Sequence, residues 1–368
     1  MKYKNIYFVA TESIKNLGNF RNYLIENTEY LVTFHFPHGY LEKPSYVEIF
    51  EKGKMVYRKE FYRFRWDVNI IKLVLYCIYF NYALFRFAKR GSFVIVENPI
   101  FCILNSITSF FKRTKFIYWI GDYYPQNSGF MRFYNKLADT YNEGLKYVLY
   151  ESPLIEKIYE AKLKKPKGKY RVSKMVTLGM KKEFVKQKLK PNKILKLGFM
   201  GVIRLQQGLD LAFDYLKTNS ECVLEVVGSG YMFEHYKQLA KNKGVGKKVK
   251  FYGFVKNPAD IIRKWDIGLA LYENTPDNVS VYCEPTKIKD YLEHGLPVIT
   301  TKTTYFYKEL EEYKSGEVIK ETIGALGSAI RKIKKDYPAY QKGVLRILND
   351  YEYDKWYDQK FSFLKENA

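Results

Sequence analysis

The chain has 368 residues, of which 47% are hydrophobic and 27% are charged. This balance is typical of a globular protein and excludes a disordered, collagen-like or low-complexity chain. At roughly 150 residues per domain, the length suggests about two domains. The cysteines stand far apart without a CxxC pair. We therefore expect a reducing compartment, with neither a disulfide scaffold nor a cysteine zinc site.

The charge is strongly positive. The 62 Lys and Arg residues outnumber the 39 Asp and Glu residues, which gives a net charge of +23. Such an excess favours anionic partners, namely nucleic acid, anionic lipid or phosphorylated substrates. Aromatic residues reach 18%, and a basic, tyrosine-rich surface suits a membrane interface as well as RNA. A genome biased toward lysine and tyrosine would give the same composition.

The first half of the chain alternates strand-like and helix-like segments. We expect helices at 19–26, 68–89 and 100–111, and strands at 5–11, 30–36, 46–50, 55–59, 93–97, 115–120 and 147–150. The segments 46–50 and 55–59 flank a Lys-Gly turn and resemble a hairpin. The remaining alternation is a βαβ rhythm, which predicts a parallel sheet covered by helices on both faces.

Two segments of this half allow alternative interpretations. The longest uncharged apolar run, 73–85, is shorter than the roughly 20 residues of a bilayer span. A buried core helix is the favoured interpretation, and an interfacial helix is the alternative. Residues 157–196 hold fifteen Lys or Arg residues and two acids. We interpret them as the end of the first domain, a strand near 174–178 and a linker; a solvated surface and a lipid- or phosphate-binding patch both remain open.

The second half repeats the rhythm more clearly. We expect helices at 209–217, 231–242, 257–264 and 287–294, and strands at 195–200, 222–227, 249–252, 267–272 and 296–300. After residue 304 the periodicity predicts helices, including 320–335 and 339–365. Two consecutive doubly wound domains favour a ligand site between the carboxyl ends of two facing sheets.

Three turns after strands of the second half contain glycine, at Gly201, Gly228 and Gly253. Glycine at such a turn lets backbone amides approach a ligand, although glycines also end strands for steric reasons alone. Neither a GxGxxG nor a GxxxxGK[ST] motif occurs, so dinucleotide binding and a P-loop kinase are poorly supported.

The segment 284–299 is the most informative. Pro285 suits the first turn of a helix, where Thr286 and the first backbone amides would present the positive helix end. Lys287 adds a cation, and Asp290 follows one turn later on the same face. Amides, a cation and a carboxylate in this arrangement suit a diphosphate joined to a ribose. An ordinary amphipathic helix closed by Gly295 is the alternative.

In this order, the features resemble the retaining GT-B glycosyltransferases of family four, the glycosyl transferases of group 1. The resemblance covers about 195–301 and rests on four pieces: the loop 199–209, the turn 226–230, the turn 249–255 and the helix 285–299. It implies an α/β protein of the GT-B class, with two facing doubly wound Rossmann-like domains and a cleft between them. It also implies a sugar donor of the nucleotide-diphosphate class.

The resemblance assigns roles to single residues. Arg204 and Lys287, with the helix-start amides, would stabilise the leaving diphosphate, and Asp122 would accept a hydrogen bond from the donor sugar or the acceptor. Gly18 and Asn19 resemble the acceptor-side loop. The implied donor-binding residues are Gly201, Gly228, Gly253, Phe254, Glu284, Pro285, Thr286 and Asp290. The resemblance implies front-face displacement with retention, no cofactor and no metal.

The sequence departs from the resembled pattern at four positions. In the resembled family, glutamates are usual at the positions of Tyr282 and Asp290, and Glu284 could substitute for the first. The usual Arg and Lys of the first loop are replaced by Val202 and Gln207. These differences motivate an alternative function, a catalytically weak or inactive relative that binds a nucleotide sugar or glycan as a partner subunit.

The domains expected are an acceptor-side domain over 1–185, a nucleotide-sugar-binding domain over 186–345, and a helix over 346–368 that crosses back to the first domain. The function expected is a retaining, hexosyltransferase-like glycosyltransferase of cell-surface polysaccharide biosynthesis. Its partners would be a nucleotide-diphosphate sugar, a glycan or lipid-linked acceptor and an anionic membrane surface, but no nucleic acid. We expect a cytoplasmic protein that is peripheral at the inner face of the cell membrane.

Overall fold

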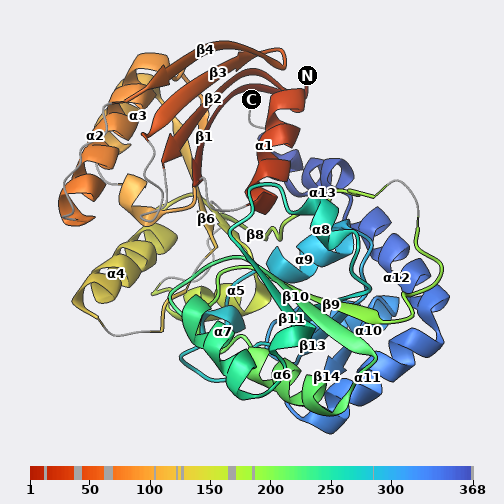
Figure 1. Ribbon diagram of the computed structural model, residues 1–368. Coiled ribbons are helices and arrows are strands. Elements are labelled where there is room, and N and C mark those ends of the chain that lie inside the picture. Colours follow the sequence, from red (N-terminus) through yellow and green to blue (C-terminus); the bar gives the residue numbers. More distant parts are fainter. Residues whose placement is uncertain are drawn as a thin grey trace. The chain divides into compact units, whose positions relative to one another are not determined.

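The structure, a computed structural model, describes residues 1–11, 15–36, 44–61, 69–102, 105–121, 123–125, 128–164, 171–184, 187–284 and 286–365. The chain divides into two compact units, which are described separately (Figure 1). Unit 1 comprises Met1–Gly179 and Tyr353–Ala368, and unit 2 comprises Met180–Glu352. The boundaries expected after residues 185 and 345 lie six and seven residues from these, and the chain from Tyr353 onward is part of unit 1.

Unit 1 is built on one sheet. Its described strands are β1 (Tyr3–Thr11), β2 (Thr28–Phe36), β3 (Tyr46–Glu51), β4 (Lys54–Glu60), β5 (Phe93–Val96), β6 (Lys115–Ile120), β7 (Tyr147–Tyr150) and β8 (Val172–Met175). Their order is β4-β3-β2-β1-β5-β6-β7-β8. The expected hairpin is confirmed, because β3 pairs antiparallel with both β2 and β4, while β1 pairs parallel with β2 and β5. The strand order therefore reverses between β1 and β5.

Helices cover both faces of this sheet. They are α1 (Lys15–Asn27), α2 (Asn69–Phe87), α3 (Asn105–Lys112), α4 (Gly129–Gly144), α5 (Pro153–Ala161) and α13 (Tyr353–Lys360), with 3₁₀ turns η1 (Pro99–Cys102) and η4 (Ser362–Leu364). Side chains alternate along β1, so Ile6 and Phe8 pack with α1 and α13, whereas Tyr7 and Val9 pack with α2. Figure 1 shows α1 and α2 on opposite sides of the strands.

A charged network surrounds the buried Glu48 carboxylate of unit 1. The Glu48 carboxylate lies 2.5 Å from Arg21 Nη2, 3.0 Å from Arg58 Nη1 and 3.4 Å from His35 Nε2. Burial by itself raises the pKa of Glu48, but the His35 hydrogen bond and the Arg21 charge outweigh it and lower that pKa to about 2. Glu48 therefore stays ionised at neutral pH.

Unit 2 is built on a second sheet, parallel throughout its described strands. They are β9 (Leu195–Met200), β10 (Cys222–Val227), β11 (Val249–Gly253), β12 (Ile267–Ala270), β13 (Val298–Thr301) and β14 (Gly316–Ile319). Their order is β11-β10-β9-β12-β13-β14. The chain runs from β9 outward to β11 and then returns to β12 on the other side of β9. This reversal places a topological switch point between β9 and β12, where ligands of such sheets bind.

The helices of unit 2 also cover both faces. They are α6 (Leu209–Thr218), α7 (Phe233–Asn242), α8 (Ala259–Ile262), α9 (Thr286–Glu293), α10 (Tyr307–Tyr313), α11 (Ile323–Lys335) and α12 (Tyr337–Asp350), with 3₁₀ turns η2 (Gly246–Lys248) and η3 (Val279–Val281). One core packs α6, α7 and α11 against the sheet, and the other packs α8, α9 and α10. The doubly wound architecture expected for this half is confirmed.

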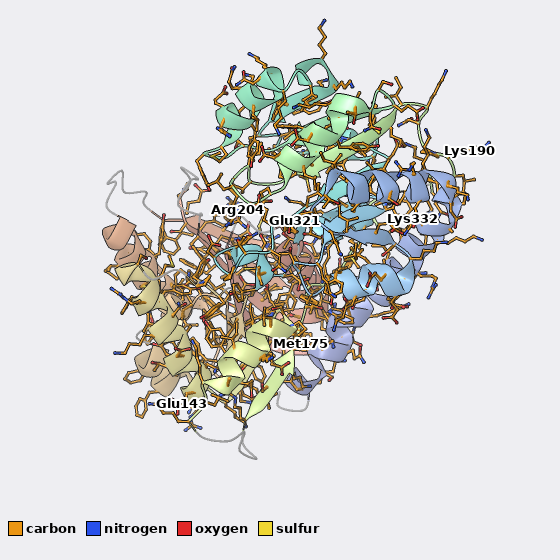
Figure 2. The ribbon with its side chains drawn as sticks, turned by 90° about the horizontal axis from the view of Figure 1, so that it is seen from below. Glu143, Met175, Lys190, Arg204, Glu321 and Lys332 are labelled. Carbon is orange, nitrogen blue, oxygen red and sulfur yellow. The ribbon has the colours of Figure 1, made fainter. Side chains whose placement is uncertain are left out.

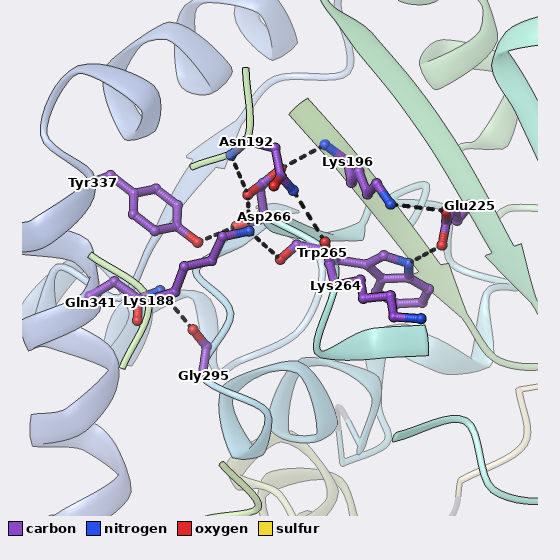
Figure 3. A network of polar contacts seen from close by, with 10 residues as sticks. All are labelled: Lys188, Asn192, Lys196, Glu225, Lys264, Trp265, Asp266, Gly295, Tyr337 and Gln341. Carbon is purple, nitrogen blue, oxygen red and sulfur yellow. Dashed lines mark hydrogen bonds and ion pairs between the residues drawn. The ribbon is translucent and has the colours of Figure 1, made fainter. Parts of the chain in front are cut away.

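Part of the lysine-rich stretch 157–196 has a structural role. Asp266, just before β12, is fully buried and accepts hydrogen bonds from the backbone N–H groups of Asn192 (3.0 Å) and Lys196 (2.8 Å). Lys188 forms an ion pair with the same carboxylate, as Figure 3 shows. A fully buried carboxylate needs such partners, so this network fastens the segment that leads into β9.

The structure corrects several expected elements. The single helix over 339–365 is wrong: α12 ends at Asp350 and α13 begins at Tyr353. Between them the backbone N–H of Met180 donates to the Tyr351 carbonyl at 2.7 Å, and Met180 bridges Glu352. These bonds need extended chain, which interrupts the helix.

Other corrections concern short elements. The helix over 100–111 is divided into η1 and α3, the helix over 257–264 is limited to α8, and the strand near 174–178 is β8, which begins two residues earlier. β14 was not expected. It has only four residues, one of them charged, so it carries a weak sequence signal.

Candidate functional site

The candidate site lies at the carboxyl edge of the unit 2 sheet, at the β9/β12 switch point. The three glycine turns expected there lie side by side. Gly201 N–H donates to the Val227 carbonyl at 3.0 Å, and Gly228 N–H donates to the Gly253 carbonyl at 2.8 Å. The ends of β9, β10 and β11 are thus joined into one surface of backbone groups.

The close approach of backbone segments at this edge of the sheet requires glycine at two positions. Gly228 has φ of 129°, and a Cβ there would lie 2.0 Å from the Gly201 carbonyl oxygen. Gly208, which precedes α6, has φ of 67°, and a Cβ there would lie 2.1 Å from the Leu271 carbonyl oxygen. Only glycine fits either position without moving backbone, so both are required by the fold whether or not a ligand binds.

Lys287, in the first turn of α9, reaches the first glycine turn. Its side chain is buried, and Nζ donates to Gln207 Oε1 at 2.6 Å. Nζ also lies 3.8 Å from the centroid of the Phe199 ring. A Cβ at Gly201 would lie 3.2 Å from Lys287 Cε. The helix start, the lysine and the glycine turn therefore meet at one point.

Arg204 brings a second positive charge to this point. Its Nη2 donates to Ser280 Oγ at 2.9 Å, which links the loop after β9 to η3; the residue is labelled in Figure 2. Burial, and next the charge of Arg204, lower the pKa of Lys287 well below its usual value. Among the described residues, no carboxylate is a cause of that shift. The site therefore disfavours the ammonium of Lys287 until an anion is supplied.

Asp290 and Glu284 differ in their surroundings. Burial raises the pKa of Tyr272, with the Asp290 charge adding to the rise and the Arg204 charge opposing it, so Asp290 belongs to the same charged cluster. Glu284 forms an ion pair with Lys289 and accepts a hydrogen bond from Tyr305 at 2.7 Å. Its carboxylate is therefore held by protein groups, and a role in donor binding stays a prediction.

Exposed apolar side chains surround the glycine turns. Phe254 is 74% exposed and Tyr231 is 72% exposed, and the backbone N–H of Leu205 donates to the Tyr231 hydroxyl at 3.3 Å. Phe254 was expected here. Tyr231, Gln207 and Ser280 were not; Tyr231 follows the GSG turn directly, which is the signal that would have identified it.

The remaining expected residues are in different positions. Gly18 and Asn19 lie within α1, which begins at Lys15. Thr286 opens α9 and is partly exposed. Asp122 and Pro285 lie outside the described residues. In the part of the chain that the structure describes, no three His, Cys, Asp or Glu side chains gather as a metal site. None of the helices described there has the length and apolar character to cross a membrane.

Comparisons with known proteins agree with this geometry. Residues 180–344 match the family model of the glycosyl transferases group 1. A search of the curated proteins gave no match. Among solved structures, Anabaena Alr3699/HepE in complex with UDP has a TM-score of 0.66 at 12% identity, covering 100% of both chains. WaaG, a glycosyltransferase involved in lipopolysaccharide biosynthesis, has a TM-score of 0.65 at 13% identity, covering 99% of both.

The family match covers nearly all of unit 2, and the structural matches extend over both units. At 12% and 13% identity, these structures establish the fold of this chain and leave its activity to be argued from the site. The resemblance inferred from the sequence is confirmed: residues 180–344 match the glycosyl transferases of group 1, in a chain with the two Rossmann-like domains of the GT-B fold.

Proposed function

We propose that this protein is a glycosyltransferase that uses a nucleotide-diphosphate sugar. One observation carries the proposal: Lys287 and Arg204 meet near the start of α9, where burial, and next the charge of Arg204, lower the pKa of Lys287. A diphosphate would offset the Arg204 charge, and the N–H groups in the first turn of a helix can bind its oxygens. The family match over the same residues supports the assignment.

The donor would lie along the carboxyl edge of β9, β10 and β11. Its diphosphate would bind Lys287, Arg204 and the amides near Thr286, with Gly201 and Gly228 allowing close approach of the backbone. The base would rest near Gly253 and Phe254, where exposed aromatic surface is available. Asp290, Glu284 and Pro285 complete the proposed donor site, with the Asp290 carboxylate accepting from ribose hydroxyls.

In the proposed reaction, the bond between the sugar C1 and the diphosphate oxygen breaks as an acceptor hydroxyl attacks C1 from the same face. The anomeric configuration is retained because attack and departure occur on the same face, and the hydroxyl proton passes to the departing diphosphate oxygen. Lys287 and Arg204 stabilise the charge that develops on that oxygen. In the proposed reaction these two side-chain cations take the role that a metal ion has in metal-dependent transferases. The proposal therefore includes no metal ion. Asp122, Gly18 and Asn19 stay predictions on the acceptor side.

We propose a surface glycan or lipid-linked molecule as acceptor, and a peripheral position at the cytoplasmic face of the membrane. The net charge of +23 supports an anionic surface as partner. Among the similar structures, HepE is in complex with UDP, and WaaG is involved in lipopolysaccharide biosynthesis. These make UDP-sugars the first donors to test and lipid-linked glycans the first acceptors.

The test is a donor screen. Purified protein is incubated with UDP-, GDP-, ADP- and dTDP-sugars, with and without a membrane extract, and free nucleotide diphosphate is measured. We expect release with at least one donor and its loss in Arg204→Gln and Lys287→Met, with unchanged circular dichroism. Absence of both binding and turnover with every donor would refute the proposal.

A second candidate is a binding subunit without turnover. One observation favours it. Glu284 is the possible substitute for the acid that Tyr282 replaces, and its carboxylate already forms an ion pair with Lys289. This candidate predicts nucleotide binding by calorimetry and no release of nucleotide diphosphate, even with a crude lipid acceptor. Turnover by the wild type would eliminate it.

A further inference from the structure

Helices α2 and α3 of unit 1 expose an apolar surface. Val74, Ile78, Tyr82 and Phe85 are each about half exposed, and they recur at the spacing of one helix face. The opposite face of α2 is buried, with Phe80, Ala83 and Leu84 inaccessible. The core helix expected over 73–85 is therefore buried on one face only, and its exposed outer face is apolar as well.

The end of α3 extends this surface. Phe110 is 80% exposed and Phe111 is 63% exposed, and their rings pack edge to face at 5.4 Å. The C-terminal turns of the two helices are joined: Lys112 Nζ donates to the Ala88 carbonyl at 3.1 Å and lies 5.5 Å from the centroid of the Phe85 ring. Figure 1 shows α2 and α3 next to each other on one side of the sheet. We call these six apolar residues and their neighbouring cations the α2–α3 surface.

The charges on α2, on α3 and on the segments beside them in the sequence are mostly positive. Between residues 69 and 121 the sequence has seven Lys or Arg residues and one acid, Glu97. Arg86, Lys89, Arg90 and Arg113 are exposed at the ends of α2 and α3. Exposed aromatic rings within a ring of cations are what an anionic lipid surface binds, since the rings enter the headgroup region while the cations meet phosphates.

A cavity beside the α2–α3 surface adds to the argument. It has a volume of about 240 Å³, and Lys4, Arg90 and Lys115 line it together with Tyr3, Phe93 and Leu364. No acidic residue is among its lining residues. A cavity with three cations and an apolar wall is suited to the phosphate of a lipid headgroup.

We propose that the α2–α3 surface docks on an anionic phospholipid bilayer, with the aromatic rings inserted at the headgroup level and a lipid phosphate in the cavity. The inference deepens the proposed membrane position by naming the surface that makes the contact. It depends on unit 1 residues alone, so its test needs no turnover.

The experiment is sedimentation of the full chain with vesicles of phosphatidylcholine, with and without phosphatidylglycerol. We expect binding to the anionic vesicles that falls with salt. Phe110→Ser with Phe111→Ser, and separately Arg86→Gln with Arg90→Gln, should each lower the partition coefficient by about tenfold or more. Lys237→Gln with Lys241→Gln removes the same charge from α7 in unit 2 and should change it less than about twofold.

Thermal melts and nucleotide binding of all variants provide the controls, because exposed substitutions should leave both unchanged. Equal binding of the wild type to neutral and anionic vesicles would overturn the proposal, as would unchanged binding of both surface variants. Self-association of the wild type that Phe110→Ser with Phe111→Ser abolishes, without vesicle binding, would assign the surface to a second copy instead. Loss of donor binding in the wild type would refute the proposed function and leave the vesicle result interpretable.

Discussion

Lys287 and Lys289 stand two residues apart on α9 and lie in opposite environments. Lys287 Nζ donates to the neutral amide oxygen of Gln207 at 2.6 Å, with Arg204 as its charged neighbour. Lys289 is fully buried and forms an ion pair with Glu284. Residues two apart point to different sides of a helix. One lysine is thus available to an external anion, whereas the other already has its counter-charge.

Lys287→Met should stabilise the protein and abolish nucleotide binding. The substitution removes a buried charge that lacks a carboxylate partner, so we expect the free energy of unfolding to rise by about 1 kcal/mol at neutral pH. Folding lowers the pKa of Lys287, so burying its ammonium destabilises the folded protein at low and neutral pH. This destabilisation decreases as the pH rises toward the unfolded pKa of about 10.4. Urea unfolding at pH 7 and pH 10 measures this; a less stable variant would contradict the assignment.

Lys289→Met should have the reverse effect. It leaves the Glu284 carboxylate buried without its cation, which costs about 3–5 kcal/mol. Adding Glu284→Gln to Lys289→Met should recover much of the loss, because the uncompensated charge is removed. Unfolding curves of the two single variants and the double variant give the coupling energy. Additive losses would show that the pair is not coupled.

Gln207→Lys tests the departure from the resembled pattern. It places a second ammonium beside Lys287, so the protein without ligand should lose about 1–2 kcal/mol. A nucleoside diphosphate should then bind more tightly, since an additional cation meets the same phosphates. Calorimetry at two salt concentrations measures the affinity, with Gln238→Lys on the exposed face of α7 as the matched control. Weaker binding by Gln207→Lys would place the phosphates elsewhere.

Glu48 should govern the acid stability of unit 1. Its pKa is lowered to about 2, so its contribution is complete above the unfolded pKa and is lost as pH falls from about 4.5 to 2. Glu48→Gln should lower the unfolding free energy by about 3 kcal/mol at pH 7 and flatten the acid limb. Thermal melts between pH 2 and pH 7 would show it, with the exposed Glu234→Gln as control. An unchanged acid limb would contradict the pKa assignment.

Much of unit 2 could be predicted from its sequence. The five strands from β9 to β13 coincide with apolar runs that end at glycine or polar turns. Residues close in the sequence therefore determine where these strands end. β14 could not be predicted, because four residues, one of them charged, are too few to show the alternation of apolar and polar residues that indicates a strand. The break between α12 and α13 depends on Met180, which pairs there from a distant part of the chain.

The site was only partly predictable. The spacing of Lys287 and Asp290 and the glycine turns are local features, and they lie where expected. The contact between Lys287 and Gln207 joins residues 80 positions apart, so it depends on how β9 and α9 pack. The pairing of Glu284 with Lys289 and Tyr305 has the same origin: a sequence shows a carboxylate, and only the fold shows that its charge is already compensated.

The most direct test of the central claim is a crystal structure with a bound nucleoside diphosphate, beginning with UDP. We expect a phosphate oxygen about 2.8 Å from Lys287 Nζ, with further bonds from Arg204 and the first N–H groups of α9. Phosphates bound away from the start of α9, with Lys287 still donating to Gln207, would contradict the account.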